Sequence, residues 1–263
     1  MTRPVQQLFD LSGRKALVTG GSRGLGLQIA EALGEAGASL MLTSRKEAEL
    51  AESADALERR GMDVRWLAGD AADPQAVERI CRSSIETMGG VDILVNNAGA
   101  TWGAPAEDHP LHAWDKVMAV NLRSAFLFSQ FIAKHSMIPN RDGRIIMMAS
   151  ICGLAGNAND TQDTVAYNAS KGALINLTRT LAAEWGEYGI TVNALAPGYF
   201  PSKMTQGVIA HHGIDKMTAR VPNRRLGDGE DLKGPAVLFA SAAGKHINGQ
   251  ILAVDGGISA VIG

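Results

Sequence analysis

The chain alternates short apolar or β-branched runs with longer helical patterns along almost its whole length. Because two parallel strands can be joined only by a long crossover, this alternation strongly limits the possible folds. It predicts an α/β fold in which a doubly wound parallel sheet carries helices on both faces, with right-handed crossovers. The expected strands are Ala16–Thr19, Leu40–Thr43, Val64–Leu67, Ile93–Val95, Arg144–Met148, Thr191–Leu195 and Ile251–Val254. The expected helices lie near 24–36, 46–60, 74–88, 111–135, 167–187 and 229–241.

The 263 residues contain no low-complexity linker and no solenoid-type repeat, so we predict a single domain over 1–263. The stretch near 198–225 fits the strand–helix order least well. It is rich in Pro, Gly, Met and His, and we expect it to form a lid over a substrate site. His211 and His212 lie in this stretch without metal-ligand spacing, so no metal site is expected.

Composition and charge argue against several classes of partner. The net charge is −2, so no electrostatic attraction to nucleic acid or to an anionic membrane is expected. No apolar run reaches the roughly 18 residues of a membrane span, and the first residues lack the apolar core of a signal peptide. The two cysteines, Cys81 and Cys152, provide no disulfide framework. We therefore expect a cytoplasmic protein.

A glycine-rich turn follows the first expected strand and precedes the first expected helix. Glycine permits a tight turn and a close approach of the backbone to phosphate, and the free N–H groups of a helix N-terminus bind anions. The turn therefore predicts a dinucleotide site, with a purely structural glycine turn as the alternative. The residues expected to contact the dinucleotide here are Gly20, Ser22, Arg23, Gly24, Leu25 and Gly26.

The end of the second expected strand, Ser44-Arg45, predicts which dinucleotide binds. A fold that binds NAD usually has an acid near this position for the ribose 2′-hydroxyl, whereas arginine accommodates a 2′-phosphate. No acid is present here, and Arg23 is expected to approach the same phosphate. The pattern favours NADP(H). The alternative is that Arg45 is a solvated residue at the start of a helix.

Two further strand ends contribute candidate cofactor residues. Asp70 and Ala71 follow the third expected strand, where the carboxylate either accepts from the adenine amino group or caps a turn. Asn97, Ala98 and Gly99 follow the fourth, where small residues let the backbone approach the adenosine.

Tyr167 and Lys171 give the clearest indication of chemistry. Their spacing of four places both on one face of the expected helix. A nearby ammonium favours the ionised form of a phenol whose ordinary pKa is about 10, so such a tyrosine exchanges a proton with a substrate oxygen. Ser150, at the carboxyl end of the fifth expected strand, is placed to hydrogen-bond the same oxygen. The alternative is a helix whose Tyr and Lys lie at a subunit contact.

These motifs together resemble the short-chain dehydrogenases/reductases over nearly the whole chain. The resemblance rests on Thr19-Gly20-x-x-x-Gly24-x-Gly26, Asn96-Asn97-Ala98-Gly99, Asn121, Ser150, Tyr167-x-x-x-Lys171 and Pro197-Gly198. It implies a Rossmann-type subunit with a seven-stranded parallel sheet, usually assembled as a tetramer. It also implies catalytic roles for Asn121, Ser150, Tyr167 and Lys171, with Asn121 holding a water that links Lys171 to solvent. The contacts it implies at the nicotinamide end come from Tyr167, Lys171, Pro197, Gly198 and Ser202.

The pattern of the later helices agrees with a homotetramer. The segments 111–135 and 167–187 carry more apolar residues than one sheet-facing stripe requires, which suggests a second surface buried between subunits. These residues include Phe126, Phe128, Phe131, Leu177 and Leu181. By contrast, the charged residues of 46–60 are expected to form a solvated helix face.

Within the family, the chain resembles 3-oxoacyl-[acyl-carrier-protein] reductases and gluconate 5-dehydrogenases. The segment Ala196–Phe200 resembles both subgroups, and the opening Leu8–Gly13 resembles the gluconate enzymes. An apolar pocket would favour an acyl substrate, so the predicted activity is NADP(H)-dependent reduction of a 3-oxoacyl thioester. The candidates for that pocket are Trp102, Leu154, Tyr199, Phe200 and Met204.

Two alternatives remain open. One is a gluconate 5-dehydrogenase or another sugar or polyol dehydrogenase, which would likewise transfer hydride between nicotinamide and a ketone or secondary alcohol. The other is a non-catalytic NADP-binding sensor.

The polar loop at 157–163 makes the gap between Ser150 and Tyr167 longer than is usual in the family, and it is a candidate for the wall of the substrate pocket.

Overall fold

The computed structural model describes residues 2–157, 163–202, 205–207 and 213–261. Its centre is one sheet of seven parallel strands in the order β3-β2-β1-β4-β5-β6-β7. Each expected strand lies within the observed one, and the predicted doubly wound fold is confirmed. The strands are β1 (Lys15–Thr19), β2 (Ser39–Ser44), β3 (Val64–Ala68), β4 (Ile93–Asn96), β5 (Gly143–Met148), β6 (Ile190–Pro197) and β7 (Ile251–Val254).

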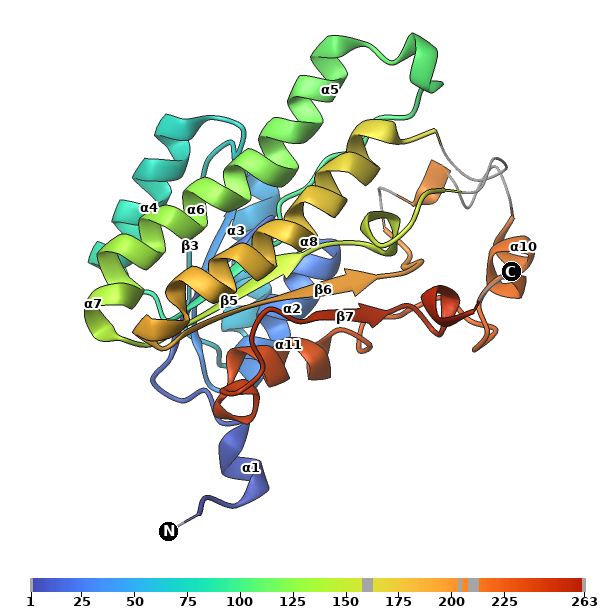
Figure 1. The fold of residues 1–263 in the computed structure, drawn as a ribbon. Helices are drawn as coiled ribbons and strands as arrows, with labels where there is room; N and C mark the ends of the chain where they lie inside the picture. The colour runs from blue at the N-terminus through green and yellow to red at the C-terminus, as the bar shows by residue number, and fades with distance from the viewer. Residues whose placement is uncertain (1, 158–162, 203–204, 208–212, 262–263) are drawn as a thin grey trace.

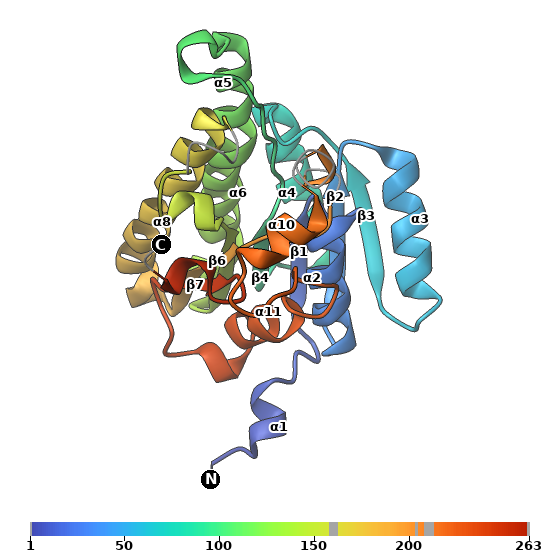
Figure 2. The same cartoon turned by 90° about the vertical axis from the view of Figure 1, so that its right-hand side faces the viewer.

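Helices cover both faces of the sheet (Figures 1 and 2). α4, α6 and α8 pack on one face, and α2, α3 and α11 pack on the other. The short helix α1 projects away from this body at the N-terminal end. The helices are α1 (Val5–Leu8), α2 (Gly24–Glu35), α3 (Glu47–Glu58), α4 (Pro74–Met88), α5 (Leu111–Met118), α6 (Ser124–Ile132), α7 (Ile138–Asn140), α8 (Val165–Trp185), α10 (Ile214–Ala219) and α11 (Lys233–Ala240).

Alternate residues of each strand fill two separate hydrophobic cores. In β1, Leu17 faces the core under α4, α6 and α8, while Ala16 and Val18 face the core under α2, α3 and α11. All three are fully buried. Because successive side chains of a strand point to opposite faces, a strand covered on both sides must be apolar along its length. The short apolar runs of the sequence therefore encode a two-sided sheet.

Two predicted helices differ in detail from the observed ones. The segment predicted at 111–135 runs on to Asn140 and contains π-helical turns at Ala119–Arg123 and Ala133–Met137. The second π-helical turn precedes Pro139, whose ring disfavours a regular turn before it. The helix predicted from 229 begins only at Lys233, because Arg225 holds both carboxylate oxygens of Asp231 in a preceding turn.

The order of the strands places a crevice between β1 and β4. β2 and β3 lie on one side of β1, and the remaining strands lie on the other. Ligands of open α/β sheets bind beyond the carboxyl ends of the strands at such a reversal. Here Asn97 Nδ2 donates to the carbonyl oxygens of Thr19 (2.9 Å) and Gly20 (3.1 Å). A Cβ on Gly26 would lie 2.3 Å from both Asn97 Nδ2 and Gly20 O, so only glycine lets α2 begin this close to the turn.

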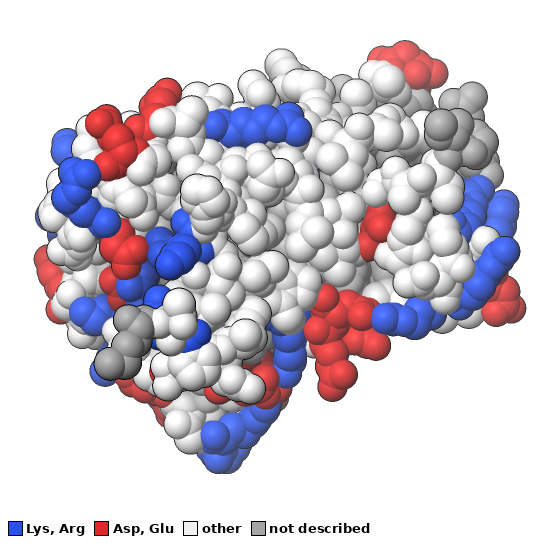
Figure 3. All heavy atoms as spheres, turned by 60° about the horizontal axis from the view of Figure 1, so that its bottom comes forward, with Lys and Arg blue, Asp and Glu red and all other residues white. Residues whose placement is uncertain are grey.

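The surface carries both signs of charge. On the face in Figure 3, Lys and Arg side chains alternate with Asp and Glu toward the edges, and a broad area between them has no charged side chain. None of the helices described is both long and apolar enough to cross a bilayer.

Candidate active site

A cavity of about 630 Å³ lies at the carboxyl ends of the strands and contains the residues predicted to bind the cofactor. The predicted residues in its wall are Gly20, Ser22, Arg23, Gly24, Leu25, Gly26, Ser44, Arg45, Asp70, Ala71, Asn97, Ala98, Gly99, Tyr167, Lys171, Pro197, Gly198 and Ser202. Ser150 also lines it. One continuous cavity thus joins the glycine turn to the Tyr167–Lys171 pair.

The glycine turn offers backbone N–H groups to the cavity. α2 begins at Gly24, and the preceding Arg23 has an extended backbone and provides no side-chain cap. The first N–H groups of a helix have no partner within the helix, and the helix dipole is positive at that end. The turn therefore has the form of an anion site facing the crevice, which fits a pyrophosphate.

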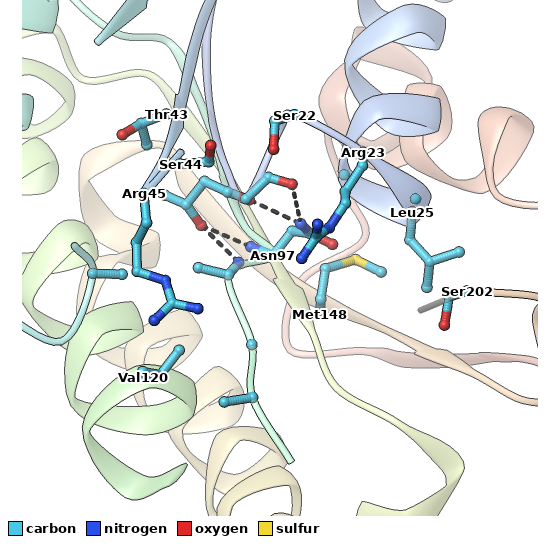
Figure 4. Close-up of a pocket in the computed structure, with 18 of the residues that line it drawn as sticks. Ser22, Arg23, Leu25, Thr43, Ser44, Arg45, Asn97, Val120, Met148 and Ser202 are labelled. Carbon is cyan, nitrogen blue, oxygen red and sulfur yellow. Dashed lines mark hydrogen bonds between the residues drawn. The ribbon is translucent and has the colours of Figure 1, made fainter. Parts of the chain in front are cut away.

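The end of β2 supplies uncommitted polar groups to the same cavity. Ser44 Oγ and Thr43 Oγ1 are buried without a hydrogen-bond partner, an arrangement that costs free energy unless a ligand completes it. Figure 4 shows the guanidinium of Arg45 extending toward Val120. Among the ion pairs between described residues, none involves Arg45. These groups fit an anionic substituent on the adenosine ribose.

Of the two roles that the sequence left open for Asp70, an adenine contact and a turn cap, the structure contains the turn cap. Its Oδ1 accepts from the N–H of Ala72 at 2.9 Å, and the residue also lines the cavity. The adenine contact remains a prediction.

Three charged residues in the cavity wall, Lys46, Glu49 and Lys116, were not expected there. Lys46 and Glu49 belong to the segment 46–60, which was predicted to present a solvated face; their side chains are 61% and 32% exposed, and they also line the cavity. Glu49 accepts from Arg23 Nη1 at 2.8 Å and from Lys46 Nζ at 2.7 Å. Lys116 and Val120 line the cavity as well, from α5 and the turn after it. The sequence signalled only that 46–60 is helical, and helical periodicity does not show which charges face another segment.

Tyr167 and Lys171 lie one turn apart on α8, next to Ser150. Lys171 is 4% exposed, and its Nζ lies 5.5 Å from the centre of the Tyr167 ring. The same Nζ donates to the carbonyl oxygen of Met148 at 2.5 Å. Ser150 follows β5 and accepts from the N–H of Cys152 at 3.2 Å, which fixes the serine at the start of a short turn. Three of the four predicted catalytic side chains, Ser150, Tyr167 and Lys171, are thus brought together.

Burial controls the ionisation of this pair. It raises the pKa of Tyr167 to about 12, against the opposing effect of a hydrogen bond from Ser150. It lowers the pKa of Lys171 to about 8, because the ammonium is taken out of water. The predicted lowering of the Tyr167 pKa by Lys171 is therefore not found: the pKa is raised, because burial of the phenol disfavours its ionised form.

Asn121 does not line the cavity but supports it. Its Oδ1 accepts from the N–H of Ala100 at 2.7 Å, and its Nδ2 donates to Ala100 O and to Ser170 Oγ, both at 2.9 Å. The side chain is 1% exposed. Both side-chain amide hydrogens are thereby used, so the predicted water would be held by an oxygen of Asn121, either Oδ1 or the main-chain carbonyl. The bonds that are present join the segment after β4 to α8.

The predicted apolar substrate pocket is assembled only in part. Phe200 lines the cavity, whereas Trp102, Leu154 and Tyr199 do not, and Met204 lies outside the described residues. Trp102 and Leu154 are 38% and 42% exposed. The expectation that these side chains converge on one apolar pocket is therefore not supported.

Other predicted features lie partly outside the described residues. Most of the 157–163 loop falls there, as do parts of the expected lid and both His211 and His212. Pro201, Ser202 and Thr205, within the expected lid, do line the cavity.

Cys152 is partly buried, and burial raises the pKa of its thiol. The residues described contain no group of three or more His, Cys, Asp or Glu arranged to hold a metal ion.

Replacing Lys171 by Met should stabilise the fold by about 1–3 kcal/mol at pH 7, because a buried ammonium is removed. The unfolded chain keeps this proton up to the ordinary lysine pKa of 10.5, whereas the folded protein releases it near pH 8. Between pH 8 and 10, the free energy of unfolding of the wild type should therefore rise relative to that of the variant, by up to about 1.4 kcal/mol per pH unit. Urea unfolding across this range measures the difference.

Lys116→Met is the matched control, since it removes an exposed ammonium from the same cavity. An equal pH dependence in both variants, or a Lys171→Met protein that is less stable at pH 7, would contradict the expectation.

Comparison with known proteins gives a consistent result. A family model described as "Enoyl-(Acyl carrier protein) reductase" matches residues 20–259. Gluconate 5-dehydrogenase of Gluconobacter oxydans is 39% identical over 254 residues, covering 96% of this chain and 97% of its own. The rhamnolipids biosynthesis 3-oxoacyl-[acyl-carrier-protein] reductase of Pseudomonas aeruginosa is 36% identical over 253 residues, covering 95% and 97% respectively.

Among solved structures, a gluconate 5-dehydrogenase from Burkholderia cenocepacia, in complex with NADP and tartrate, superposes with a TM-score of 0.92. It is 35% identical in sequence, and the match covers 98% of this chain and all of that one.

Proposed function

The chain belongs to the short-chain dehydrogenase/reductase family, and we propose that it is an NADP(H)-dependent oxidoreductase acting on a ketone or secondary alcohol of a sugar acid or polyol. One observation carries the reaction type: a single cavity joins a phosphate-binding turn to Ser150, Tyr167 and Lys171. A proton donor and a hydrogen-bonding hydroxyl would therefore lie beside the nicotinamide end.

The choice of NADP(H) rests on the far end of the cavity. Ser44 Oγ is buried without a partner, and Arg45 carries a positive charge into the wall. A 2′-phosphate would satisfy the hydroxyl and bind the guanidinium through two oxygens. The NADP complex of the B. cenocepacia gluconate 5-dehydrogenase supports the same cofactor.

The chain's own residues supply the proton and the geometry of the reaction. When bound, NADPH supplies the hydride that adds to the substrate carbon. Tyr167 gives its hydroxyl proton to the substrate oxygen, and Ser150 donates a hydrogen bond to that oxygen as negative charge develops on it. Lys171 holds the cofactor ribose and stabilises the resulting phenolate. In the oxidation direction Tyr167 takes the proton back. Asn121 acts through position, since it fixes α8 against the segment after β4.

The preference for a polyhydroxy substrate rests on two observations. Of the apolar side chains expected to favour an acyl chain, Trp102, Leu154 and Tyr199 do not line the cavity. A sugar-acid dehydrogenase is also among the most similar relatives and among the most similar solved structures. The second candidate substrate is a 3-oxoacyl thioester, which the 36% identical P. aeruginosa 3-oxoacyl-[acyl-carrier-protein] reductase favours.

A substrate panel tests these proposals. We expect the purified protein to oxidise NADPH with 5-ketogluconate or a related ketose faster than with a 3-oxoacyl thioester. Tyr167→Phe should lower turnover by about a hundredfold or more for every active substrate, because the proton donor is lost, while NADPH binding stays near normal. Tyr188→Phe, on the short turn after α8 and outside the cavity, is the control.

The outcomes of this panel separate the candidates. If kcat/KM is higher for the 3-oxoacyl thioester than for the sugar-acid ketone, the thioester becomes the assigned substrate in place of the polyol. Near-normal turnover of Tyr167→Phe would remove the catalytic role of that residue. Tight NADPH binding without turnover of any carbonyl would favour the non-catalytic sensor.

Arg45→Ala should weaken NADPH binding by about ten- to a hundredfold, since a charge-assisted contact to phosphate contributes roughly 1.5–3 kcal/mol. NADH has no phosphate at this position, so its affinity should barely change. Measuring kcat/KM for both cofactors checks this. A wild type that prefers NADH, or an equal loss for both cofactors, would leave Arg45 as a surface charge only.

The proposal includes a homotetramer. Phe126 on α6 remains 36% exposed and Leu252 on the edge strand β7 is 37% exposed, so both elements keep apolar surface uncovered. The broad uncharged area in Figure 3 is compatible with a subunit contact. Phe128 and Leu181, which the sequence also suggested for this surface, are instead in the core. Phe131 and Leu177 are partly buried against that core.

Static light scattering at micromolar concentration should give about four times the subunit mass of 27.7 kDa. Phe126→Gln should shift the distribution toward smaller species. A monomeric wild type would contradict the assembly.

The remaining parts of the proposal concern setting and access. The protein would work in the cytoplasm, where the diffusible NADP(H) pool is available. The segment near 198–225 would close over the substrate, with Ser202 bonding the nicotinamide carboxamide. Pro201, Ser202 and Thr205 in the cavity wall support this placement.

A further inference from the structure

Glu49 is an acid that lies among three cations in the cavity wall, at the end proposed to bind adenosine. Arg23 comes from the glycine turn, and Arg45 and Lys46 come from the end of β2. Glu49 pairs with Arg23 at 2.8 Å and with Lys46 at 2.7 Å. One carboxylate therefore pairs with two of these three cations and offsets one of their two positive charges.

The position of Glu49 is fixed by the backbone rather than by its own flexible side chain. Ser53, one turn further along α3, donates to Ser22 O at 2.6 Å and to Glu49 O at 2.8 Å. Ser53 is 9% exposed, so this link is shielded from water. It ties the glycine turn to the first turn of α3, which keeps the carboxylate within reach of Arg23.

We propose that Glu49 is a cofactor-specificity residue that limits the preference for a 2′-phosphorylated adenosine by competing with the phosphate for Arg23 and Lys46. The proposal rests on the NADP(H) assignment above. A phosphate that approaches Arg23 must displace the carboxylate or lie beside it, and two anions near each other repel. An adenosine without the 2′-phosphate meets no such competition. Glu49 therefore reduces the difference in binding affinity between the phosphorylated and the unphosphorylated cofactor.

The competition is of modest strength. The side chains of Glu49, Arg23 and Lys46 are 32%, 49% and 61% exposed, so water screens both ion pairs. A dianionic phosphate, which also reaches Ser44 and Arg45, therefore displaces the carboxylate. The carboxylate lowers the affinity for phosphate without abolishing it.

Calorimetric titration of the full chain with adenosine 2′,5′-bisphosphate and with 5′-AMP tests the proposal without any catalytic turnover. Glu49→Gln should tighten binding of the bisphosphate about three- to tenfold, the factor expected when two exposed ion pairs need no longer be broken. Binding of 5′-AMP should change by less than about twofold, because it lacks the phosphate that competes.

Glu47→Gln is the matched control. Glu47 lies in the same first turn of α3, but it is exposed and does not line the cavity. The substitution removes the same charge and the same favourable interaction with the helix dipole. It should leave the ratio of the two affinities unchanged.

A double substitution tests whether Glu49 acts through Arg23. In an Arg23→Gln background, Glu49→Gln should give a smaller gain for the bisphosphate, since one of the two competing pairs is already absent. An equal gain in both backgrounds would overturn the competition for Arg23.

The proposal is overturned if Glu49→Gln leaves bisphosphate binding unchanged or weaker, or tightens 5′-AMP equally, or is matched by Glu47→Gln. These results are distinct from failure of the NADP(H) assignment. That assignment fails if the wild type binds 5′-AMP as tightly as the bisphosphate, whatever Glu49→Gln does to the ratio.

Discussion

The junction between β1 and β4 is the constraint on which the rest of the cavity depends. Thr19 Oγ1 accepts from the N–H groups of Asn97 and Ala98, each at 3.0 Å, and donates to Val95 O at 3.2 Å. The Asn97 side chain then returns two hydrogen bonds to the backbone of Thr19 and Gly20. Because these bonds lie where the sheet reverses its order, they hold the glycine turn beside the end of β4 and keep the crevice open.

The buried ammonium of Lys171 lowers the stability of the fold and has a proposed role in the reaction. Lys171 is almost fully buried, and its Nζ donates a hydrogen bond to a backbone carbonyl. Burial weakens the hold of Lys171 on its proton and strengthens that of Tyr167. An unpaired buried charge is costly, so its presence agrees with a role that needs the charge once a ligand is bound. Sites that conflict with the rest of a fold in this way are frequently functional.

The adenosine end differs because its charges are exposed and share partners. Arg45 is the cation expected from the sequence, and it is free to reach a ligand (Figure 4). Arg23 and Lys46 instead share one carboxylate from the neighbouring helix. On our proposal, cofactor selectivity at this end depends on a balance of screened interactions, whereas the chemistry at the other end depends on the desolvated Tyr167–Lys171 pair.

The sequence by itself determined the order of strands and helices, the glycine turn and the Tyr167–Lys171 pair. Each depends on a pattern within a few residues: apolar runs, the conformational freedom of glycine, or a spacing of four on a helix. These local patterns predicted the seven strands, and the residues they proposed for the cofactor at the glycine turn and at the ends of the second, third and fourth strands all line the cavity.

Only the tertiary structure decided which distant groups meet. Glu49 on α3 accepts a hydrogen bond from Arg23 in the glycine turn. The side chain of Asn121 forms its hydrogen bonds with Ala100 and Ser170. Trp102 and Leu154 remain outside the cavity although their apolar character suited a pocket. The physical reason is that a side chain's type fixes which partners it can accept, whereas the packing of segments far apart in the chain fixes which of them lies within hydrogen-bond distance.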